Sequence, residues 1–215
     1  MKLIIFDLDG TLLDTGKGIL KCVASTLKKM GFQVPNEDVC KSFIGPPLKK
    51  RFLEIFKTDE ETANAFVAAF REEYSKGDLF LVDQYEGMME CLTELKKEYS
   101  LAVATNKRED FAVALLERCG MAHFFDAICG SDIASTLTKT QIVANAADKL
   151  GVPHTDCVVV GDSNSDAEAA AQLGMPFIGV TYGYGFKGVA DVDLYLNVGC
   201  VDKPLFLNET VKLRG

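Results

Sequence analysis

The fold is decided near the amino terminus by the stretch LIIFDLDGTLLDT, residues 3–15. Its apolar run, Leu3 to Phe6, is followed at once by Asp7, Asp9 and Gly10. A short continuous apolar run that ends in turn residues is typical of a strand buried on both faces of a parallel sheet. Two aspartates two positions apart at the end of such a strand point to the same side of the sheet, about 7 Å apart along the chain.

Similar apolar runs recur along the chain and alternate with helical patterns such as Met88 to Tyr99 and Gln141 to Leu150. The further runs are Leu101 to Thr105, Ala127 to Cys129, Cys157 to Val160 and Phe177 to Val180. Alternation of this kind predicts an α/β fold, with a Rossmann-like parallel sheet covered by helices on both faces.

The segment between the first two predicted strands has a different pattern. From Lys17 to Tyr74 apolar residues recur at three- and four-residue steps, which indicates amphipathic helices. An ordinary crossover needs far fewer residues. We therefore predict a helical cap domain at residues 15–83, inserted into a core formed by residues 1–14 and 84–215, with Gly16 and Gly87 near its hinges.

Composition and charge exclude several classes of protein. The 215 residues are 48% hydrophobic, which excludes a disordered chain, and 23 Lys plus Arg against 31 Asp plus Glu give a net charge of −8. Such an acidic chain is a poor partner for nucleic acid. No apolar stretch approaches the roughly 20 residues that span a bilayer, so no membrane association is expected.

The cysteines and histidines do not form a recognisable metal site. Seven cysteines, an odd number without a C-x-x-C pair, predict free thiols in a reducing cytoplasm. Neither His123 nor His154 lies at zinc-ligand spacing from a cysteine or carboxylate. We therefore expect a cytoplasmic protein without a zinc site; a monomer and a homodimer are both compatible with the sequence.

Polar residues follow the predicted strands in a way that suggests a site. Because ligands of open α/β sheets bind at the carboxyl ends of the strands, these residues are expected to converge. Alone, each has an ordinary explanation as a helix cap, turn or solvated residue. Together they combine the hard oxygen ligands that Mg²⁺ prefers with a lysine. The set is Asp7, Asp9, Thr105, Asn106, Lys139, Asp162 and Asp166.

These residues resemble the four motifs of the haloacid dehalogenase superfamily. The stretch DLDGTLLDT at residues 7–15 is similar to the first motif, and GDSNSD at residues 161–166 is similar to the fourth. Thr105-Asn106 and Lys139 correspond to the second and third in order and spacing. Within the superfamily, phosphoglycolate phosphatase-like members are most similar, through Gly45-Pro46-Pro47-Leu48 in the cap and Gly183-Tyr184-Gly185 after the last core strand.

The resemblance implies a Mg²⁺-dependent phosphatase of small phosphorylated metabolites. Asp7 would be the nucleophile, forming an aspartyl-phosphate, and Asp9 the acid and base. The resemblance assigns metal binding to the Asp7 carboxylate, the Asp9 backbone carbonyl, Asp162 and Asp166. It assigns phosphoryl binding to Thr105, Asn106 and Lys139.

Three local features lie outside this motif set. Thr140 stands where many relatives have proline, which affects only the predicted helix start. The segment from Tyr182 to Phe186 is expected to be a simple surface turn. In the near-neutral cap, whose 11 basic and 10 acidic residues give +1 against −9 elsewhere, Lys49, Lys50 and Arg51 form the densest basic run. This run is either a solvated helix face or a contact to an anionic substrate.

Alternative functions remain open at this point. A sugar-phosphate mutase similar to β-phosphoglucomutase uses the same motifs, and a pyrophosphatase or nucleotidase differs only in substrate. A dehalogenase is disfavoured because it has no use for a second aspartate at position 9. A phospho-accepting receiver module is disfavoured because it needs neither a cap nor the Asp-x-Asp arrangement.

Overall fold

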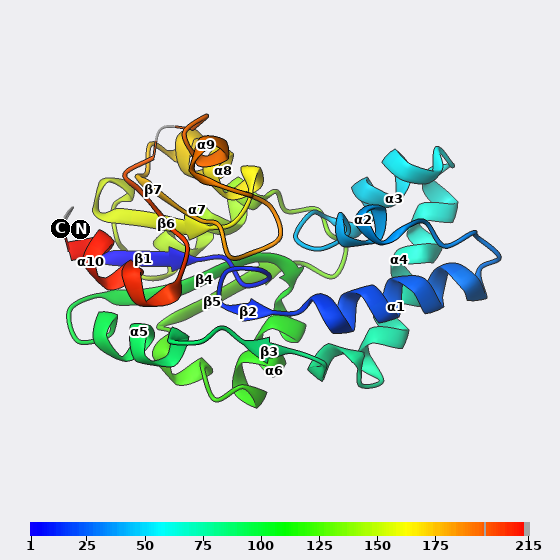
Figure 1. Cartoon of the computed structure of the whole chain (residues 1–215), viewed down its shortest axis with the longest axis horizontal. Coiled ribbons are helices and arrows are strands. Elements are labelled where there is room, and N and C mark those ends of the chain that lie inside the picture. Colours follow the sequence, from blue (N-terminus) through cyan, green and yellow to red (C-terminus); the bar gives the residue numbers. More distant parts are fainter. Residues whose placement is uncertain (196, 213–215) are drawn as a thin grey trace.

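The computed structural model describes residues 1–195 and 197–212. Its core is a six-stranded parallel sheet in the order β5-β4-β1-β6-β7-β8 (Figure 1). The strands are β1 (Leu3–Phe6), β4 (Ser100–Arg108), β5 (Ala127–Ser131), β6 (Cys157–Gly161), β7 (Phe177–Val180) and β8 (Gly199–Val201). The predicted α/β, Rossmann-like class is confirmed.

The central strand β1 shows why the sheet is buried on both sides. Its side chains alternate between two apolar clusters: Ile4 and Phe6 pack on one face, Leu3 and Ile5 on the other. The first face is covered by α5 (Met88–Leu95), α6 (Glu109–Arg118) and α10 (Leu207–Lys212), and the second by α7 (Lys139–Lys149), α8 (Asn164–Leu173) and α9 (Val189–Val192). Short 3₁₀ turns lie at η2 (Ala122–Phe124), η3 (His154–Asp156) and η4 (Pro204–Phe206).

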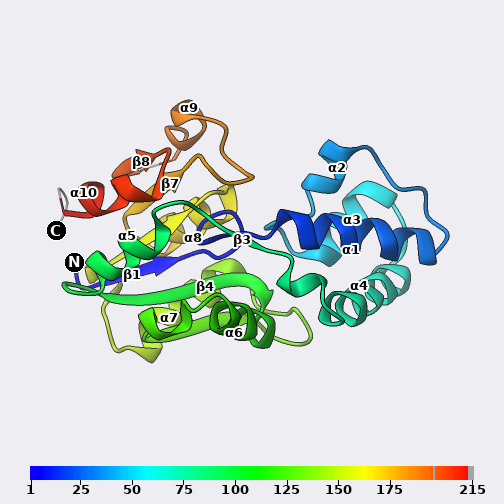
Figure 2. The same ribbon diagram turned by 60° about the horizontal axis from the view of Figure 1, so that its bottom comes forward.

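A helical unit stands at one end of the core, beyond the loops that follow β1 and β4 (Figures 1 and 2). It consists of α1 (Gly16–Lys29), α2 (Glu37–Lys41), α3 (Leu48–Phe56), α4 (Glu60–Ser75) and η1 (Asp78–Phe80). Its interior is aromatic: the ring of Phe52 stacks on Phe66 with centroids 4.3 Å apart, Phe32 packs edge-on against Phe52 and Phe56, and Phe56 is tilted against Phe52. These contacts join α3, α4 and the chain after α1.

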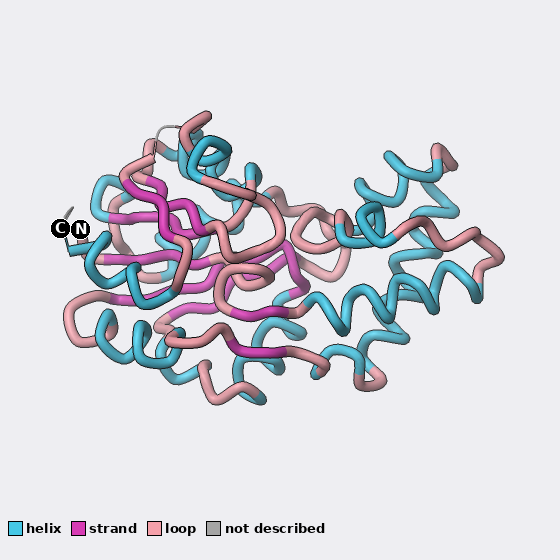
Figure 3. Tube along the Cα trace, viewed as in Figure 1, coloured by secondary structure: helices cyan, strands magenta, loops and turns pink. Residues whose placement is uncertain are grey.

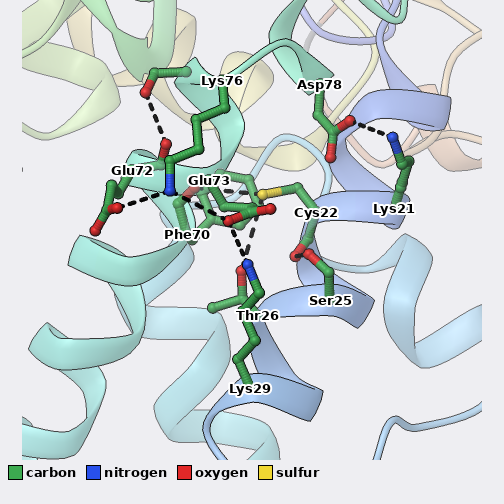
Figure 4. Close-up of polar contacts among 11 residues, drawn as sticks. Lys21, Cys22, Ser25, Thr26, Lys29, Phe70, Glu72, Glu73, Lys76 and Asp78 are labelled. Carbon is green, nitrogen blue, oxygen red and sulfur yellow. Dashed lines mark hydrogen bonds and ion pairs between the residues drawn. The ribbon is translucent and has the colours of Figure 1, made fainter.

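Polar contacts tie α1 to α4 and η1 along their outer faces (Figure 4). Lys29 pairs with Glu73 at 2.5 Å and Lys21 with Asp78 at 2.7 Å. Between them the buried Cys22 thiol donates to the Phe70 carbonyl at 3.4 Å. The ion pairs are solvent-exposed, so the aromatic interior contributes most of the cap's stability.

Two antiparallel segments connect the helical unit to the core: β2 (Leu13–Asp14) and β3 (Asp83–Gln84). Figure 3 shows them as a short ribbon between the sheet and the cap. The predicted domain borders, between residues 14 and 15 and between 83 and 84, fall in this ribbon. We propose that residues 15–83 form the cap domain.

The sequence pattern missed β8 and shortened β4 by four residues. Gly199–Val201 is too short for an apolar run, and it forms a strand because β7 offers it an open edge. The end of β4 is polar, so nothing in its composition marks it as a strand. None of the described helices is long and apolar enough to cross a membrane.

We expect Phe52→Ala to lower the free energy of unfolding by about 3–5 kcal/mol, because it opens a cavity among stacked rings in the fully buried cap interior. Urea denaturation followed by circular dichroism measures this loss. The matched control is Phe206→Ala, whose ring is 47% exposed and whose loss should stay below about 1.5 kcal/mol. Equal losses in the two variants would contradict the packing described.

Candidate active site

Asp7 lies directly after β1, and its carboxylate is held by a lysine from a distant part of the chain. Lys139 Nζ lies 2.5 Å from Asp7 Oδ1, 2.8 Å from Asp166 Oδ1 and 2.7 Å from the Ala104 carbonyl oxygen. All three side chains are buried. Burial by itself would lower the pKa of Lys139, but the Asp166 and Asp7 carboxylates outweigh it and raise that pKa above its ordinary value.

Lys139 is placed by the start of α7. Thr138 caps this helix: its hydroxyl accepts from the Gln141 backbone N–H, and Gln141 Oε1 accepts from the Thr138 backbone N–H, which makes a full capping box. The helix therefore begins at Lys139 without a proline at position 140. A lysine at a helix start is electrostatically unfavourable, so its position is explained by the carboxylates it meets.

Asp162 and Asp166 complete an acidic cluster with Asp7. Each of the three buried residues offers one carboxylate oxygen, and these oxygens lie within 4.8 Å of one another. Asp166 sits in the first turn of α8, where its Oδ2 accepts from the Ser163 backbone and hydroxyl. Three carboxylates with one lysine leave a formal charge of −2. The donor set and its charge therefore fit a divalent cation.

The protonation of Asp162 reflects the same crowding. Burial raises the pKa of Asp162 to about 7, and the neighbouring charge of Asp166 adds to this effect. Two backbone N–H groups oppose it, since Tyr184 and Gly185 both donate to Asp162 Oδ2, at 2.7 and 3.0 Å. A bound cation would remove the remaining repulsion.

Asp9 has different neighbours from Asp7. Its Oδ1 accepts from the Thr15 hydroxyl at 2.6 Å and lies 2.8 Å from Lys107 Nζ, which itself approaches the hydroxyl of Tyr74 in the cap at 3.5 Å. Burial opposes the charge of Lys107, but the Asp9 carboxylate outweighs it and raises the pKa of Lys107. Each of the two aspartates thus has its own lysine.

Thr105 and Asn106 lie in β4, beside Asp7. Thr105 is buried, and its hydroxyl accepts from the Lys107 backbone N–H at 3.1 Å. The side-chain amide of Asn106 donates to the carbonyl of Gly45 in the cap at 3.1 Å. Of the residues predicted to bind phosphate, Asn106 therefore stands where the core meets the cap.

The expectation of a simple surface turn at residues 182–186 is wrong. This loop carries the two N–H groups that hold Asp162, and the Tyr184 hydroxyl donates to Asp14 Oδ1 and accepts from the Gly16 backbone N–H at 2.6 Å. The loop comes so close that a Cβ on Gly183 would lie 2.3 Å from the Gly10 carbonyl oxygen. Only glycine fits there, and the loop joins the acidic cluster to the start of α1.

A cavity of about 440 Å³ lies between cap and core, with Asp9 in its wall. Lys49 and Lys50 line it, but Arg51 does not, because its guanidinium binds the Ser42 hydroxyl at 2.8 Å and the Glu54 carboxylate at 2.9 Å. The remaining wall is mostly apolar and includes the α4 face formed by Val67, Phe70, Arg71 and Tyr74.

Sequence reasoning missed several residues of this site. Lys107 directly follows the Thr105-Asn106 motif, and that adjacency was the available signal. Arg71 lies on a helix face whose apolar spacing was interpreted as core. Tyr184 belongs to the Gly183-Tyr184-Gly185 motif, but its contacts had no local signal because they come from residues about 170 positions away.

A Rossmann-like core with a clustered aspartate site, a paired lysine and a helical cap defines a phosphoryl-transferring hydrolase. The model of the haloacid dehalogenase-like hydrolases matches residues 4–180, so the chain belongs to this family. Its similarity to known phosphatases identifies it as a phosphoglycolate phosphatase-like phosphomonoester hydrolase, which confirms the prediction from the motifs.

The individual relatives support this class. A 5'-nucleotidase from Pseudomonas aeruginosa is 34% identical over 184 residues, covering 85% of this chain and 83% of that protein. A phosphoglycolate phosphatase from Agrobacterium fabrum is 32% identical, covering 85% and 81%. The crystal structure of a predicted phosphatase from Clostridium acetobutylicum has a TM-score of 0.93 at 33% identity, covering 99% and 98%.

The raised pKa of Asp162 makes cation binding depend on pH. Below about pH 7 a cation must displace a proton from Asp162, so its affinity falls. In the metal-free fold the Asp162 carboxyl favours its protonated form. Its contribution to the free energy of unfolding is therefore lost as the pH rises through 7, and a bound cation restores that stability. We expect Mg²⁺ at about 100 times its Kd to raise the Tm by about 5–10 °C at pH 8.

At pH 5.5 the same Mg²⁺ concentration should raise the Tm by only about 2–3 °C, because protons compete for the site. Thermal melts of the metal-free protein with and without Mg²⁺ measure both values. If Mg²⁺ leaves the Tm unchanged at both pH values, the acidic cluster is not a cation site.

Tyr184→Phe separates the two connections of the loop. The variant loses the hydroxyl bonds to Asp14 and Gly16, so stability should fall by about 1–3 kcal/mol. The backbone donors to Asp162 remain, so the Kd for Mg²⁺ should change by less than about twofold. Urea denaturation and calorimetry measure the two effects. Tyr99→Phe is the control, because the Tyr99 hydroxyl makes no hydrogen bond to the described residues. This variant should lower the free energy of unfolding by less than about 0.5 kcal/mol.

Proposed function

We propose that this protein is a Mg²⁺-dependent phosphatase that hydrolyses small phosphomonoesters through an aspartyl-phosphate on Asp7. The observation that carries the proposal is the division of the two aspartates. Asp7 lies with Lys139 and the acidic cluster, whereas Asp9 lies in the wall of the cavity where a leaving group would stand. This division matches a nucleophile and an acid/base in separate surroundings.

In the first step the Asp7 carboxylate oxygen forms a bond to phosphorus while the ester oxygen leaves. Asp9 gives a proton to that oxygen, so that the leaving group departs as an alcohol. Thr105 and the backbone of Asn106 hold the phosphoryl oxygens, and the positive charge of Lys139, whose three N–H groups meet Asp7, Asp166 and Ala104, offsets their developing charge. In the second step Asp9 takes a proton from water, which attacks phosphorus and releases phosphate from Asp7.

Asp7, Asp162 and Asp166 would hold the magnesium ion, together with the backbone carbonyl of Asp9. When bound, the ion supplies charge neutralisation for the attacking carboxylate and the phosphoryl group. Lys139 keeps the Asp7 carboxylate oriented, and Ser163 fixes Asp166. Phosphatases of this family generally use a divalent cation, and we propose that the ion bound here is Mg²⁺.

The substrate belongs to the small phosphomonoesters, with phosphoglycolate as the first candidate. The alternative within the phosphatases is a nucleotidase, favoured by the cavity of about 440 Å³ and by the similarity to a 5'-nucleotidase. Lys49 and Lys50 would face the leaving group from the cap.

Phosphate release from a panel of esters with Mg²⁺ tests the function. Phosphoglycolate, a nucleoside monophosphate, pyrophosphate and a hexose 1-phosphate form the panel. We expect prompt multiple turnover of at least one ester. Conversion of the hexose 1-phosphate to a 6-phosphate without release of phosphate would show a mutase instead.

Asp7→Asn should lower kcat by at least about 10³-fold, because a neutral amide cannot replace the attacking carboxylate. The matched substitution Asp202→Asn changes an exposed residue outside the cap and should leave kcat unchanged. Phosphate release under saturating Mg²⁺ measures both. Substantial turnover by Asp7→Asn would refute the covalent mechanism.

A further inference from the structure

The cavity between cap and core carries an excess of positive charge. Five cationic and three acidic side chains line it, which gives a net charge of +2: Lys49, Lys50, Arg71, Lys107 and Arg108 against Asp9, Glu54 and Glu60. The rest of the wall is largely apolar, and a charge in such surroundings is weakly screened. The excess therefore favours a negatively charged occupant.

Most of these cations already have an acidic partner. Lys107 pairs with Asp9 and Lys49 with Glu60, while Arg108 binds Asp110 through two nitrogens. Within residues 1–195 and 197–212, no carboxylate lies within ion-pair distance of Lys50 or Arg71. Lys50 is exposed and has no ion-pair partner among the described residues, whereas Arg71 is held in place.

Arg71 is fixed by two neutral oxygens of the core. Its Nη1 donates to the Ile133 carbonyl at 2.5 Å and its Nη2 to the Ser135 hydroxyl at 2.6 Å. Both acceptors lie in the loop that leads to Lys139. A guanidinium has five N–H groups, so three remain for a ligand. Burial and the nearby charge of Arg108 lower the pKa of Arg71, and the charges of Asp110 and Asp132 oppose this effect only in part.

We propose that Arg71 is a specificity-determining residue that binds a second anionic group, a carboxylate or a phosphate, on the leaving group of the substrate. The proposal rests on the proposed phosphatase function. The sequence suggested Arg51, in the basic run at 49–51, as a cap residue that contacts an anionic substrate. In the structure it is Arg71 whose guanidinium lies on the cap and lines the cavity. Its planar donors suit carboxylate and phosphate oxygens, and its bonds to the core fix the fork before the substrate arrives.

A structural role is the competing explanation. Because Arg71 joins α4 to residues 133 and 135, its loss could loosen the cap for every substrate alike. A charge-recognition role affects only substrates that carry the second anion. The two roles are therefore separated by substrates that share the same two-carbon phosphate unit and differ in this group.

Three esters of a two-carbon alcohol make this comparison. 2-Hydroxyethyl phosphate has a neutral leaving group, 2-phosphoglycolate carries a carboxylate, and ethylene glycol bisphosphate carries a second phosphate. For the wild-type protein with Mg²⁺ we expect kcat/KM to be at least about tenfold higher for one or both anionic esters than for the neutral one.

Arg71→Met keeps the length of the side chain and removes its charge. We expect this variant to raise KM at least about tenfold for the preferred anionic ester, with kcat and the neutral ester changed by less than about threefold. Arg71→Lys, which keeps the charge and loses the fork, should recover part of the loss. Arg118→Met, on the core helix α6, is the matched control and should match the wild type on all three esters.

Each outcome decides between the roles. A loss confined to the carboxylate ester or to the bisphosphate supports the proposal and identifies the second anion. An equal loss on all three esters, or no preference of the wild type for an anionic ester, overturns it. If the wild type releases phosphate from no ester in this set or in the broader panel, the proposed function fails, which is distinguishable from a failure of Arg71 alone.

Discussion

The contact between Lys139 and the carboxylates of Asp7 and Asp166 is the constraint on which the site depends. Three buried carboxylates, each with an oxygen within 4.8 Å of the others, repel one another strongly, and burial raises the pKa of Asp7 and of Asp162. One ammonium group at 2.5 and 2.8 Å removes part of this cost. What remains suits a divalent cation, so the protein is built to be completed by one.

This constraint explains features of the fold that otherwise look costly. Lys139 stands in the first turn of α7, against the favoured sign of charge at a helix start, while Asp166 occupies the favoured position in α8. Gly10 and Gly183 allow two loops to meet beside Asp162, where a Cβ on Gly10 would lie 2.4 Å from its carboxylate oxygen. Local helix and loop preferences yield here to the geometry of the acidic cluster.

The parts of the structure that could be predicted from the sequence are those whose signal is local. The strand before Asp7 and the lysine before an apolar helix have contiguous patterns, and parallel strands bring their ends together. The strand β8 and the partners of Tyr184 depend on tertiary contacts over long chain distances, which no local pattern contains. Arg71 shows a subtler limit: helical spacing identifies the inward face of α4 but does not distinguish packed core from cavity wall.

The two aspartates after β1 also differ in which domain can influence them. Among the described residues the Asp7 carboxylate is held by Lys139, a residue of the core, so its position does not depend on the cap. Asp9 instead accepts from Thr15, the residue before the first cap helix, and from Lys107, which contacts Tyr74 on α4. A movement of the cap therefore changes the surroundings of Asp9 and leaves those of Asp7 intact. In the proposed mechanism the leaving group would lie on the cap side, so a movement of the cap would act on proton transfer by Asp9 while Asp7 stays fixed.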